Sequence, residues 1–257
     1  MHLIPGINHK TIVITGGTRG VGREFILAAL KAGAKVSFCW HHSLEKYKDL
    51  EEELKIFPKE QWFGIQADVS KEEDVKKLFI KTLEKFSAID VVISNAAISR
   101  DSLLVSLPEE LWDEIVGVNL TGAFLVTKMA TQYFIDEKRK GRLIIVGSLA
   151  DSGTPSNACY SLSKGALLGL MNYLHNHHSK EITVNIVTFG LIDTEMTRYY
   201  PEEAKQVLIR TSILNRFAKG EEAAKLLLFL SSENGMFLAG KNIHATNGLL
   251  DFPILHK

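Results

Sequence analysis

The sequence contains little cysteine and no excess of charge of either sign. Its two cysteines, Cys39 and Cys159, lie in unlike contexts without the spacing of metal ligands. We therefore expect two reduced, packed thiols and no disulfide scaffold. The 30 Lys and Arg side chains equal the 30 Asp and Glu side chains in number. Because zero net charge gives no long-range attraction for polyanions, nucleic acid and anionic membranes are not expected as partners.

Apolar runs long enough to cross a bilayer are also missing. The chain has no stretch of about eighteen apolar residues, and residues 1–10 lack the apolar centre of a signal peptide. The composition, 46% hydrophobic and 23% charged, is that of an ordinary globular protein. No linker or low-complexity tract divides the chain. We therefore expect a cytoplasmic protein whose residues 1–257 form one domain.

Seven short runs rich in β-branched residues alternate with longer amphipathic stretches. The runs are 11–15, 35–40, 62–67, 91–94, 142–147, 183–189 and 241–245. Strands that alternate with helices predict a parallel sheet, because parallel neighbours need a crossover connection and right-handed crossovers cover both faces. The expected fold is a single doubly wound, Rossmann-type α/β domain with a seven-stranded, mainly parallel sheet.

One stretch, at about residues 193–215, breaks this alternation. It carries Met196, Tyr199, Tyr200 and Pro201 but no strand-forming run, which predicts a helical segment. In an open α/β sheet, ligands bind outside the carboxyl ends of the strands, so a segment after the sixth strand is well placed to cover a substrate. The alternative is an extra pair of surface helices.

A glycine-rich turn directly follows the first β-branched run. Residues 15–22 read Thr-Gly-Gly-Thr-Arg-Gly-Val-Gly, and we call them the glycine loop. Glycines let the backbone approach a pyrophosphate closely, while the N-terminus of the following helix receives its charge. The loop therefore predicts a dinucleotide site. Its expected cofactor-binding residues are Gly16, Thr18, Arg19, Gly20, Val21 and Gly22.

The end of the second run indicates which nicotinamide cofactor is used. An acidic residue there would bind a ribose 2′-hydroxyl and repel a 2′-phosphate, but the chain reads Trp40-His41-His42-Ser43. Arg19 adds a planar cation suited to phosphate. We therefore expect NADP(H) to be preferred, with NAD(H) possible and with Trp40 and His41 among the binding residues. Arg19 as a solvated surface charge, and the histidines as exposed spectators, are the alternatives.

Ser148, Tyr160 and Lys164 form a candidate catalytic group. Tyr160 and Lys164 are four residues apart, which places both side chains on one face of a helix. A tyrosine titrates at about pH 10 and a nearby positive charge lowers its pKa, so Lys164 is expected to make Tyr160 usable for proton transfer. Ser148, at the end of the fifth run, is expected to hydrogen-bond the substrate oxygen. The pair alone is a weak signal, but with the glycine loop it indicates hydride chemistry.

Over essentially its whole length the sequence resembles the short-chain dehydrogenase/reductase family. The resemblance rests on the glycine loop, the pair Asp68-Val69, the turn Ser94-Asn95-Ala96-Ala97, Asn119 within residues 118–120, and residues 189–194. It implies a catalytic tetrad of Asn119, Ser148, Tyr160 and Lys164, in which the asparagine steadies a water that feeds protons through the lysine. The resemblance further implies cofactor contacts from Asp68, Val69, Asn95, Ala96, Ala97, Tyr160, Lys164, Gly190, Ile192 and Thr194.

Within that family, residues 95–104, 215–217 and 221–224 resemble the 3-oxoacyl-[acyl-carrier-protein] reductases. This implies NADPH-dependent reduction of a 3-oxoacyl thioester on a carrier protein, in fatty acid or polyketide biosynthesis, with Tyr160 as the proton donor. Lys138, Arg139 and Lys140 are either a contact for an acidic carrier or a solvated helix end.

Several positions depart from the family pattern. Ala97 replaces a glycine, Phe189 a proline, and Thr246-Asn247 replace Val-Asp, while the spacing from Ser148 to Tyr160 is one residue short. They favour a specialised member, and two alternatives stay open. One is a reductase or dehydrogenase for a free small ketone, sugar or polycyclic alcohol, and the other is a catalytically silent cofactor-binding regulator or scaffold.

Two further features concern metals and assembly. His175, His177 and His178 lie near a predicted helix end, where imidazoles are common, so no metal is expected. The family implies a homo-oligomer, a tetramer or a dimer, through residues 111–134 and 161–175. The apolar side chains of Leu167, Leu168, Leu170 and Met171 are equally suited to that contact or to the sheet.

Overall fold

The computed structural model describes residues 6–100, 102–154 and 157–249. A seven-stranded sheet with the order β3-β2-β1-β4-β5-β6-β9 is its centre, and every strand pairing in it is parallel. The strands are β1 (Thr11–Thr15), β2 (Lys35–Trp40), β3 (Trp62–Gln66), β4 (Val91–Ser94), β5 (Gly141–Ser148), β6 (Ile182–Phe189) and β9 (Asn242–Ala245). All seven predicted strands are confirmed, with ends that shift by no more than one residue.

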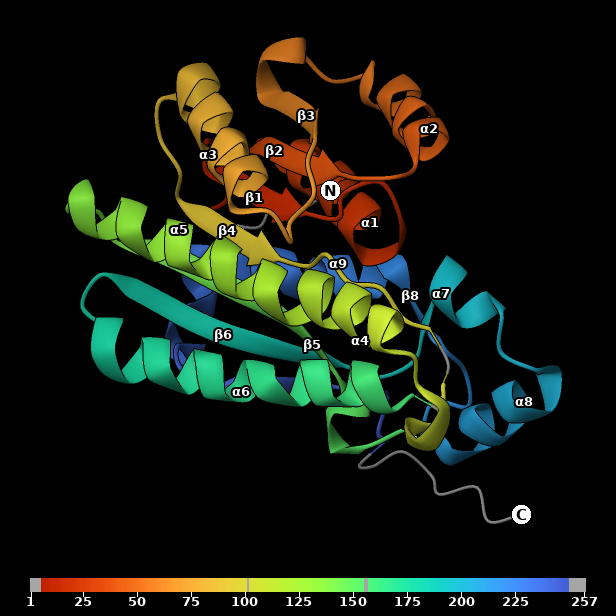
Figure 1. The fold of residues 1–257 in the computed structure, drawn as a ribbon. Coiled ribbons are helices and arrows are strands. Elements are labelled where there is room, and N and C mark those ends of the chain that lie inside the picture. The colour runs from red at the N-terminus through yellow and green to blue at the C-terminus, as the bar shows by residue number, and fades with distance from the viewer. Residues whose placement is uncertain (1–5, 101, 155–156, 250–257) are drawn as a thin grey trace.

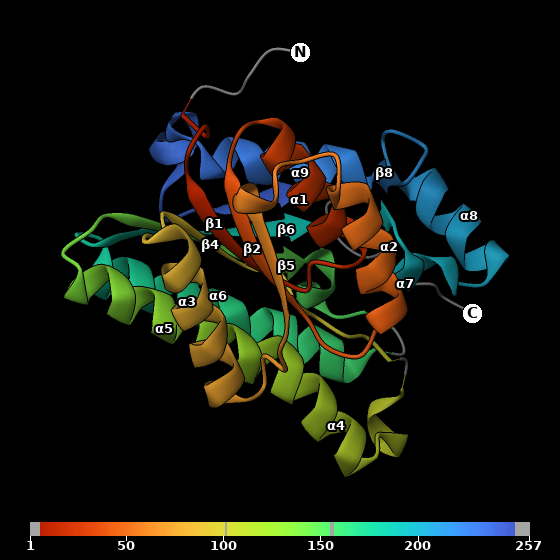
Figure 2. The same ribbon diagram turned by 90° about the horizontal axis from the view of Figure 1, so that it is seen from above.

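Helices cover both faces of the sheet (Figures 1 and 2). On one face are α1 (Gly20–Lys31), α2 (Leu44–Leu54) and α9 (Gly220–Ser231), and on the other α3 (Glu72–Phe86), α5 (Gly122–Asp136) and α6 (Ala158–His178). Each face has its own buried apolar cluster. The inner strands β1, β2, β4 and β6 are buried on both sides, which is why they read as nearly continuous apolar runs rather than as alternating ones. The doubly wound fold is therefore confirmed.

Shorter elements complete the described chain. Helix α4 (Glu109–Val116) runs through a π-helical turn, η3 (Gly117–Thr121), directly into α5. The 3₁₀ turns are η1 (Lys59–Gln61), η2 (Leu104–Ser106), η4 (Leu149–Ser152) and η5 (Glu233–Leu238). No helix in the described ranges is both long and apolar enough to cross a membrane.

The carboxyl ends of the strands define where a ligand can bind. Strand β1 pairs with β2 on one side and β4 on the other, so the chain reverses its direction of winding between β1 and β4. Such a switch point opens a crevice at the carboxyl edge of a parallel sheet. The glycine loop follows β1 and therefore lies at this crevice.

The segment predicted as helical at about 193–215 contains two helices, α7 (Glu195–Arg198) and α8 (Glu202–Thr211). A two-stranded parallel sheet of β7 (Ile192–Asp193) and β8 (Ala218–Lys219) joins its base. Figure 1 shows both helices beyond the end of the sheet toward which β6 points. The predicted helices are present, and they stand at the ligand-binding edge.

The basic run Lys138, Arg139 and Lys140 lies at the opposite edge. It connects the end of α5 to the start of β5, and Arg139 donates to Asp90 over 3.2 Å, just before β4 begins. The 15-residue helix α5 separates the run from the crevice by about 20 Å. The run therefore does not line the crevice.

The apolar face of α6 packs mainly on the sheet. Leu167 and Met171 are buried in the cluster beneath α6, and Leu168 and Leu170 are partly buried against it. Other apolar side chains on α5 and α6 are exposed, namely Phe124, Ile135, Leu162 and Tyr173. Leu167, Leu168, Leu170 and Met171 thus contribute to the core beneath α6. The apolar side chains that face outward are the four exposed ones named above.

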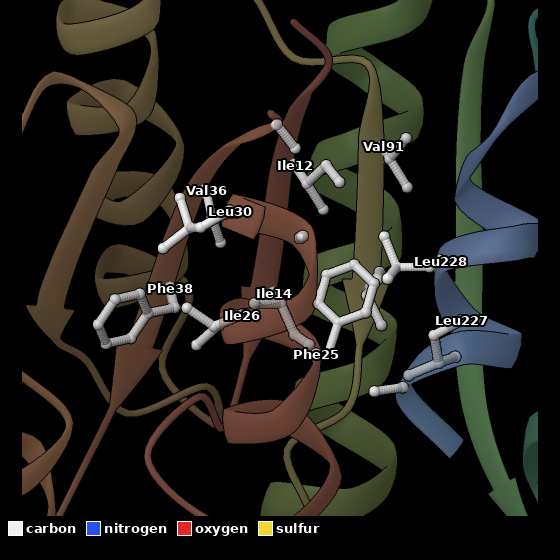
Figure 3. Close-up of a cluster of buried hydrophobic side chains, with 14 of the residues drawn as sticks. Ile12, Ile14, Phe25, Ile26, Leu30, Val36, Phe38, Val91, Leu227 and Leu228 are labelled. Atoms are coloured by element: carbon white, nitrogen blue, oxygen red, sulfur yellow. The ribbon is translucent and has the colours of Figure 1, made fainter. Parts of the chain in front are cut away.

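Phe25 connects α1, which follows the glycine loop, to the core. Its ring is fully buried and lies between the sheet residue Ile14 and the α9 residues Leu227 and Leu228 (Figure 3). An aromatic ring at such a position removes a large apolar area from water. The orientation of α1, and with it the glycine loop, depends on this contact.

Replacing Phe25 with alanine should lower the free energy of unfolding by about 3–5 kcal/mol, because it leaves a cavity between α1 and α9. Urea unfolding measures the loss. The matched control is Ile80→Ala on α3, where the side chain is 55% exposed and the change should be within about 0.5 kcal/mol. Equal losses at the two positions would contradict this account of the core.

Candidate active site

A single cleft of about 1010 Å³ runs along the carboxyl ends of the strands. Residues from the glycine loop line one part of it, and Ser148, Tyr160 and Lys164 line another. Every residue predicted for the site lines this cleft except Gly22 and Asn119, which lie behind its wall. Residues far apart in the sequence are therefore brought together as expected.

The glycine loop is shaped for a close approach of backbone to a ligand. Gly16 and Gly20 have φ angles of +68° and +50°, which favour glycine. A Cβ on Gly22 would lie 2.3 Å from the backbone oxygen of Gly16, so a side chain cannot fit there. Helix α1 begins at Gly20 with no side-chain cap and no acidic residue in its first turn. Its free N–H groups and positive end thus suit an anionic pyrophosphate.

Asn95 fixes the glycine loop to the end of β4. Its Nδ2 donates to the backbone oxygens of Thr15 (2.8 Å) and Gly16 (3.1 Å). The Thr15 hydroxyl in turn accepts from the backbone N–H groups of Asn95 and Ala96, both at 3.0 Å. The turn 94–97 therefore holds the glycine loop against the end of β4, and this contact limits the width of the cleft.

Trp40, His41 and Asp68 line the cleft where β2 and β3 end. Trp40 is mostly buried and stacks on Tyr47, with ring centroids 4.9 Å apart. His41 Nε2 lies 3.8 Å from Asp68 Oδ2. Desolvation raises the pKa of Asp68, but hydrogen bonds from Ser70 and nearby positive charge outweigh it, so the pKa is lowered. Asp68 is thus an ionised acceptor at neutral pH.

Ser148 and Tyr160 form a hydrogen-bonded pair at the centre of the cleft. Ser148 ends β5 and its Oγ also accepts from the backbone N–H of Ala150 at 3.2 Å. Desolvation raises the pKa of Tyr160 to about 12, although the hydrogen bond with Ser148 lowers it. The expected lowering of this pKa is therefore wrong for this structure. At neutral pH Tyr160 is a neutral phenol.

Lys164 shows why the sequence expectation fails. It lies one helical turn after Tyr160 and is buried, with its Nζ 5.8 Å from the centre of the Tyr160 ring. The ammonium donates to the backbone oxygen of Val146 at 2.8 Å rather than to the phenol. Desolvation lowers the pKa of Lys164 to about 8. Helical spacing fixes the shared face of the two residues, but it does not fix the hydrogen-bond partner.

Asn119 lies behind the cleft, and its side chain hydrogen-bonds to two different elements. It is 1% exposed within the π-helical turn η3. Its Oδ1 accepts from the N–H of Ile98 at 2.8 Å, while Nδ2 donates to the backbone oxygen of Ile98 and to Ser163 Oγ. The side chain thus joins the loop after β4 to α6. π-helical turns are frequent at functional sites.

Residues 189–194 approach the cleft from the end of β6. A Cβ on Gly190 would lie 2.8 Å from Cα of Thr246, so the two loops are in direct contact. Asn247 Nδ2 donates to the backbone oxygen of Leu191 at 3.2 Å. Thr194 caps α7 through a reciprocal capping box with Thr197. The pair Thr246-Asn247, which departs from the family pattern, therefore contacts and hydrogen-bonds to this segment.

Comparisons with known proteins agree with this arrangement. The family model for short chain dehydrogenases matches residues 10–205. The chain belongs to the short-chain dehydrogenase/reductase family. It is 30% identical to a 3-oxoacyl-[acyl-carrier-protein] reductase FabG of Staphylococcus epidermidis, with 94% of this chain and 99% of the relative covered. For the FabG of Thermotoga maritima the identity is 34%, with 94% and 98% covered.

A solved structure shows the same fold. The crystal structure of a short-chain dehydrogenase/reductase, glucose/ribitol dehydrogenase, from Brucella melitensis has a TM-score of 0.89, with 25% identity over 97% of this chain and 100% of that one. This chain is therefore an NAD(P)-dependent oxidoreductase of the short-chain dehydrogenase/reductase family that acts on CH–OH or C=O groups.

Several residues of the short-chain dehydrogenase/reductase cleft are not predictable from the sequence pattern. Asp113 and Glu114 of α4 line it, and so does Glu195 at the start of α7. Glu195 is in the first turn of α7, where acidic residues normally complement the helix dipole. Asp113 and Glu114 lie in the second half of α4, where charged side chains on a surface helix are common, so no local signal distinguished these residues. Within the described residues, no three His, Cys, Asp or Glu side chains gather as a metal site would require.

Replacing Lys164 with methionine should leave the free energy of unfolding at pH 7 unchanged or raise it, because the buried ammonium is costly to desolvate. The pKa of about 8 lies below the ordinary value of 10.5. The cost is thus complete below pH 8 and disappears as the pH rises to about 10.5, so the gap between variant and wild type should shrink by about 1–3 kcal/mol.

Urea unfolding at pH 7 and at pH 10 measures that gap. Lys31→Met is the matched control, since Lys31 is exposed on α1, and its gap should not change with pH. A large loss of stability in Lys164→Met at pH 7 would show that the ammonium stabilises the fold, and would refute the argument.

Proposed function

We propose that the protein reduces the carbonyl of a 3-oxoacyl thioester, carried on acyl carrier protein, to a hydroxyl with NADPH. The observation that carries the proposal is the convergence of the glycine loop with Ser148, Tyr160 and Lys164 in one cleft. The names of the relatives from Staphylococcus epidermidis and Thermotoga maritima support this substrate. The retained catalytic group argues against a silent regulator or scaffold.

The residues present fit a nicotinamide dinucleotide. Gly16 and Gly22 approach so closely that only glycine is accommodated, and the uncapped start of α1 faces the same space. The glycine loop would hold the pyrophosphate, Asp68 and Val69 the adenine, and Ile192 and Thr194 the carboxamide. When bound, the reduced cofactor supplies a hydride to the carbonyl carbon.

Tyr160 supplies the proton in this mechanism. Because its pKa is raised to about 12, the phenol is protonated at neutral pH and can donate to the carbonyl oxygen as negative charge develops there. The Ser148 hydroxyl is hydrogen-bonded to Tyr160 and so reaches the same oxygen as a second donor. The C=O bond order falls to one, the carbon gains the hydride, and the oxygen gains the phenolic proton.

Lys164 restores the proton to Tyr160. Its pKa of about 8 lies well below the pKa of about 12 of Tyr160, so passage of a proton from the ammonium to a tyrosinate is favourable. A phenolate formed next to the ammonium would be stabilised by that charge. Asn119 acts as a positioning residue, since it holds the loop after β4 against α6. We also propose that a water molecule links Lys164 to solvent.

The α7–α8 segment would cover the substrate. Met196, Tyr199 and Tyr200 from this segment line the cleft, and Tyr200 lies near Tyr160. Tyr199 is 89% exposed and Met196 40%, so this segment presents apolar surface to solvent. Such surface suits an acyl chain that enters along the segment.

A specific observation favours a second candidate, a free carbonyl compound. Asp113 and Glu114 line the cleft, and Glu109 and Glu110 continue the acidic surface of α4. An acidic carrier protein is repelled by such a rim, and the basic run 138–140 lies at the opposite edge of the sheet. That run does not line the cleft, so it adds no positive charge at the entrance.

We also propose that the exposed apolar residues of α5 and α6 form a homo-oligomer interface.

Tyr160→Phe should lower kcat for carbonyl reduction by about 10²–10⁴-fold, because it removes the proton donor. Nicotinamide absorbance at saturating substrate measures the rate. Affinity for NADPH, followed by fluorescence, should change little, and Tyr133→Phe on α5 should keep full activity. Wild-type rates in Tyr160→Phe would refute the mechanism.

The substrate is tested with purified protein and NADPH, or NADH, against one 3-oxoacyl group in three forms. These are the thioester on acyl carrier protein, the thioester on a small thiol, and a panel of free ketones. The proposed function predicts turnover of the thioesters, with NADPH preferred. Activity on free ketones alone would establish the second candidate, and cofactor binding without any turnover would establish the regulator or scaffold.

A further inference from the structure

Two hydroxyl groups in the wall of the cleft have no acceptor for their protons. Ser99 Oγ, in the loop after β4, accepts from Asn157 Nδ2 at 2.6 Å, and among the hydrogen bonds of the described residues nothing accepts from Ser99 Oγ. Thr154 Oγ1, between η4 and α6, is shielded from solvent and has no hydrogen-bond partner in the part of the chain that the structure describes. Both residues line the cleft together with Asn157 and Tyr160. Two unused donors from separate segments thus stand in one cleft.

The backbone next to each hydroxyl is held by hydrogen bonds. The Asn157 N–H donates to the carbonyl oxygen of Thr154 at 3.3 Å, and the Thr154 N–H donates to Ser161 Oγ at 3.0 Å. The residue before Ser99 is bonded to Asn119 through both its N–H and its carbonyl oxygen. Because Asn157 contacts both segments, the two hydroxyls lie near each other, in positions set by the protein itself.

Asn157 stands at the start of α6 but does not cap this helix. It is the N-cap residue and is 5% exposed, yet its side chain makes no capping hydrogen bond. Asparagine is one of the preferred N-cap residues, so its side chain gives up a favourable local bond and donates to Ser99 instead. A hydroxyl that accepts such a bond is polarised, which strengthens the bond that it donates in turn. Asn157 therefore has the place of a positioning residue for Ser99.

This polar group lies close to the proposed proton donor. Asn157 precedes Tyr160 by three residues, which is about 4.5 Å along a helix axis. Tyr160 is hydrogen-bonded with Ser148, and the oxygen of the reacting carbonyl would lie between these two. A second acceptor oxygen near the reacting carbonyl would then face Ser99 and Thr154. A 3-oxoacyl thioester carries such an oxygen, because one carbon atom separates its two carbonyl groups.

We propose that the hydroxyls of Ser99 and Thr154 donate to the thioester carbonyl oxygen of a 3-oxoacyl substrate, and that Asn157 orients Ser99 for this contact. We call these two hydroxyls the second-carbonyl subsite. The inference rests on the proposed function and adds two residues that determine specificity. Since no hydrogen bond within the described residues holds Thr154 Oγ1, rotation about one side-chain bond turns it toward the substrate without breaking one.

A subsite of this kind rejects a ketone that lacks the second carbonyl. Without an acceptor from the substrate, the two hydroxyls are removed from water and stay unpaired, which costs free energy in the complex. The subsite therefore favours 3-oxoacyl compounds over simple ketones of the same length.

The test compares two substrates that differ only at the second carbonyl. They are the 3-oxobutanoyl thioester of N-acetylcysteamine and the thioether in which a methylene group replaces the thioester carbonyl. Nicotinamide absorbance with NADPH gives kcat/KM for each, and the readout is the ratio of the thioester value to the thioether value. Comparing this ratio between variants cancels the intrinsic reactivity of the two ketones and the fraction of protein that is folded.

Ser99→Ala should lower the ratio about 3- to 10-fold, and so should Thr154→Val, because each removes one hydrogen bond to the thioester oxygen. Thr154→Ser keeps a hydroxyl and should keep the ratio of the wild type. The matched control is Ser102→Ala in the same loop. The Ser102 hydroxyl donates to the carbonyl oxygen of the next residue and does not line the cleft, so the ratio should not change.

Asn157→Ala tests the positioning role. It should lower the ratio by acting on Ser99, and the double variant Asn157→Ala with Ser99→Ala should show no lower ratio than Ser99→Ala alone. A merely structural role of Asn157 would lower kcat/KM for both substrates alike and leave the ratio unchanged.

An equal loss on both substrates in Ser99→Ala and Thr154→Val would overturn the subsite, and so would an unchanged ratio. Failure of the proposed function gives a different result, since the wild type would then reduce the thioether but not the thioester. A wild type that reduces the thioester, together with unchanged ratios in the variants, would keep the proposed function and remove only the second-carbonyl subsite.

Discussion

The close approach of the β1 and β4 ends is the constraint on which the rest of the site depends. The Asn95 amide bonds the backbone of Thr15 and Gly16, and the Thr15 hydroxyl accepts from the turn after β4. At this separation Gly22 packs against the Gly16 carbonyl with no room for a Cβ. These contacts thus hold the start of α1 open to a pyrophosphate and set the edge from which the catalytic residues are placed.

In the proposed catalytic group, the burial of Lys164 costs stability and also shifts the pKa values on which the proposed proton transfer depends. Lys164 is buried and its ammonium has only the carbonyl of Val146 as a partner among the hydrogen bonds of the described residues. Burial lowers the pKa of Lys164 from 10.5 to about 8 and raises that of Tyr160 from 10.0 to about 12, so the two values move apart. A tyrosinate would therefore take a proton from the Lys164 ammonium more readily than it would in water.

The substrate side of the cleft is built from elements outside the sheet. Helix α4 brings acidic side chains to it, and the α7–α8 segment brings exposed apolar ones. Neither element is needed to hold β1 against β4, so their surfaces can change without loss of the fold. The proposed redox chemistry therefore depends on the geometry of the sheet edge, whereas under the proposed function these peripheral helices would select the carbonyl compound.

The sequence by itself determined the seven strands, the doubly wound order and the meeting of the glycine loop with Ser148, Tyr160 and Lys164 in one cleft, because buried parallel strands read as apolar runs and the glycine loop has a local steric cause. Only the tertiary structure decided which partner each charged group has. Lys164 donates to a backbone carbonyl of β5 rather than to Tyr160. Asn119 links the loop after β4 to α6, and the basic run 138–140 lies at the edge of the sheet opposite the cleft. Spacing along a helix fixes the face a side chain shares, but its partner comes from elements distant in the chain, and burial then sets its pKa.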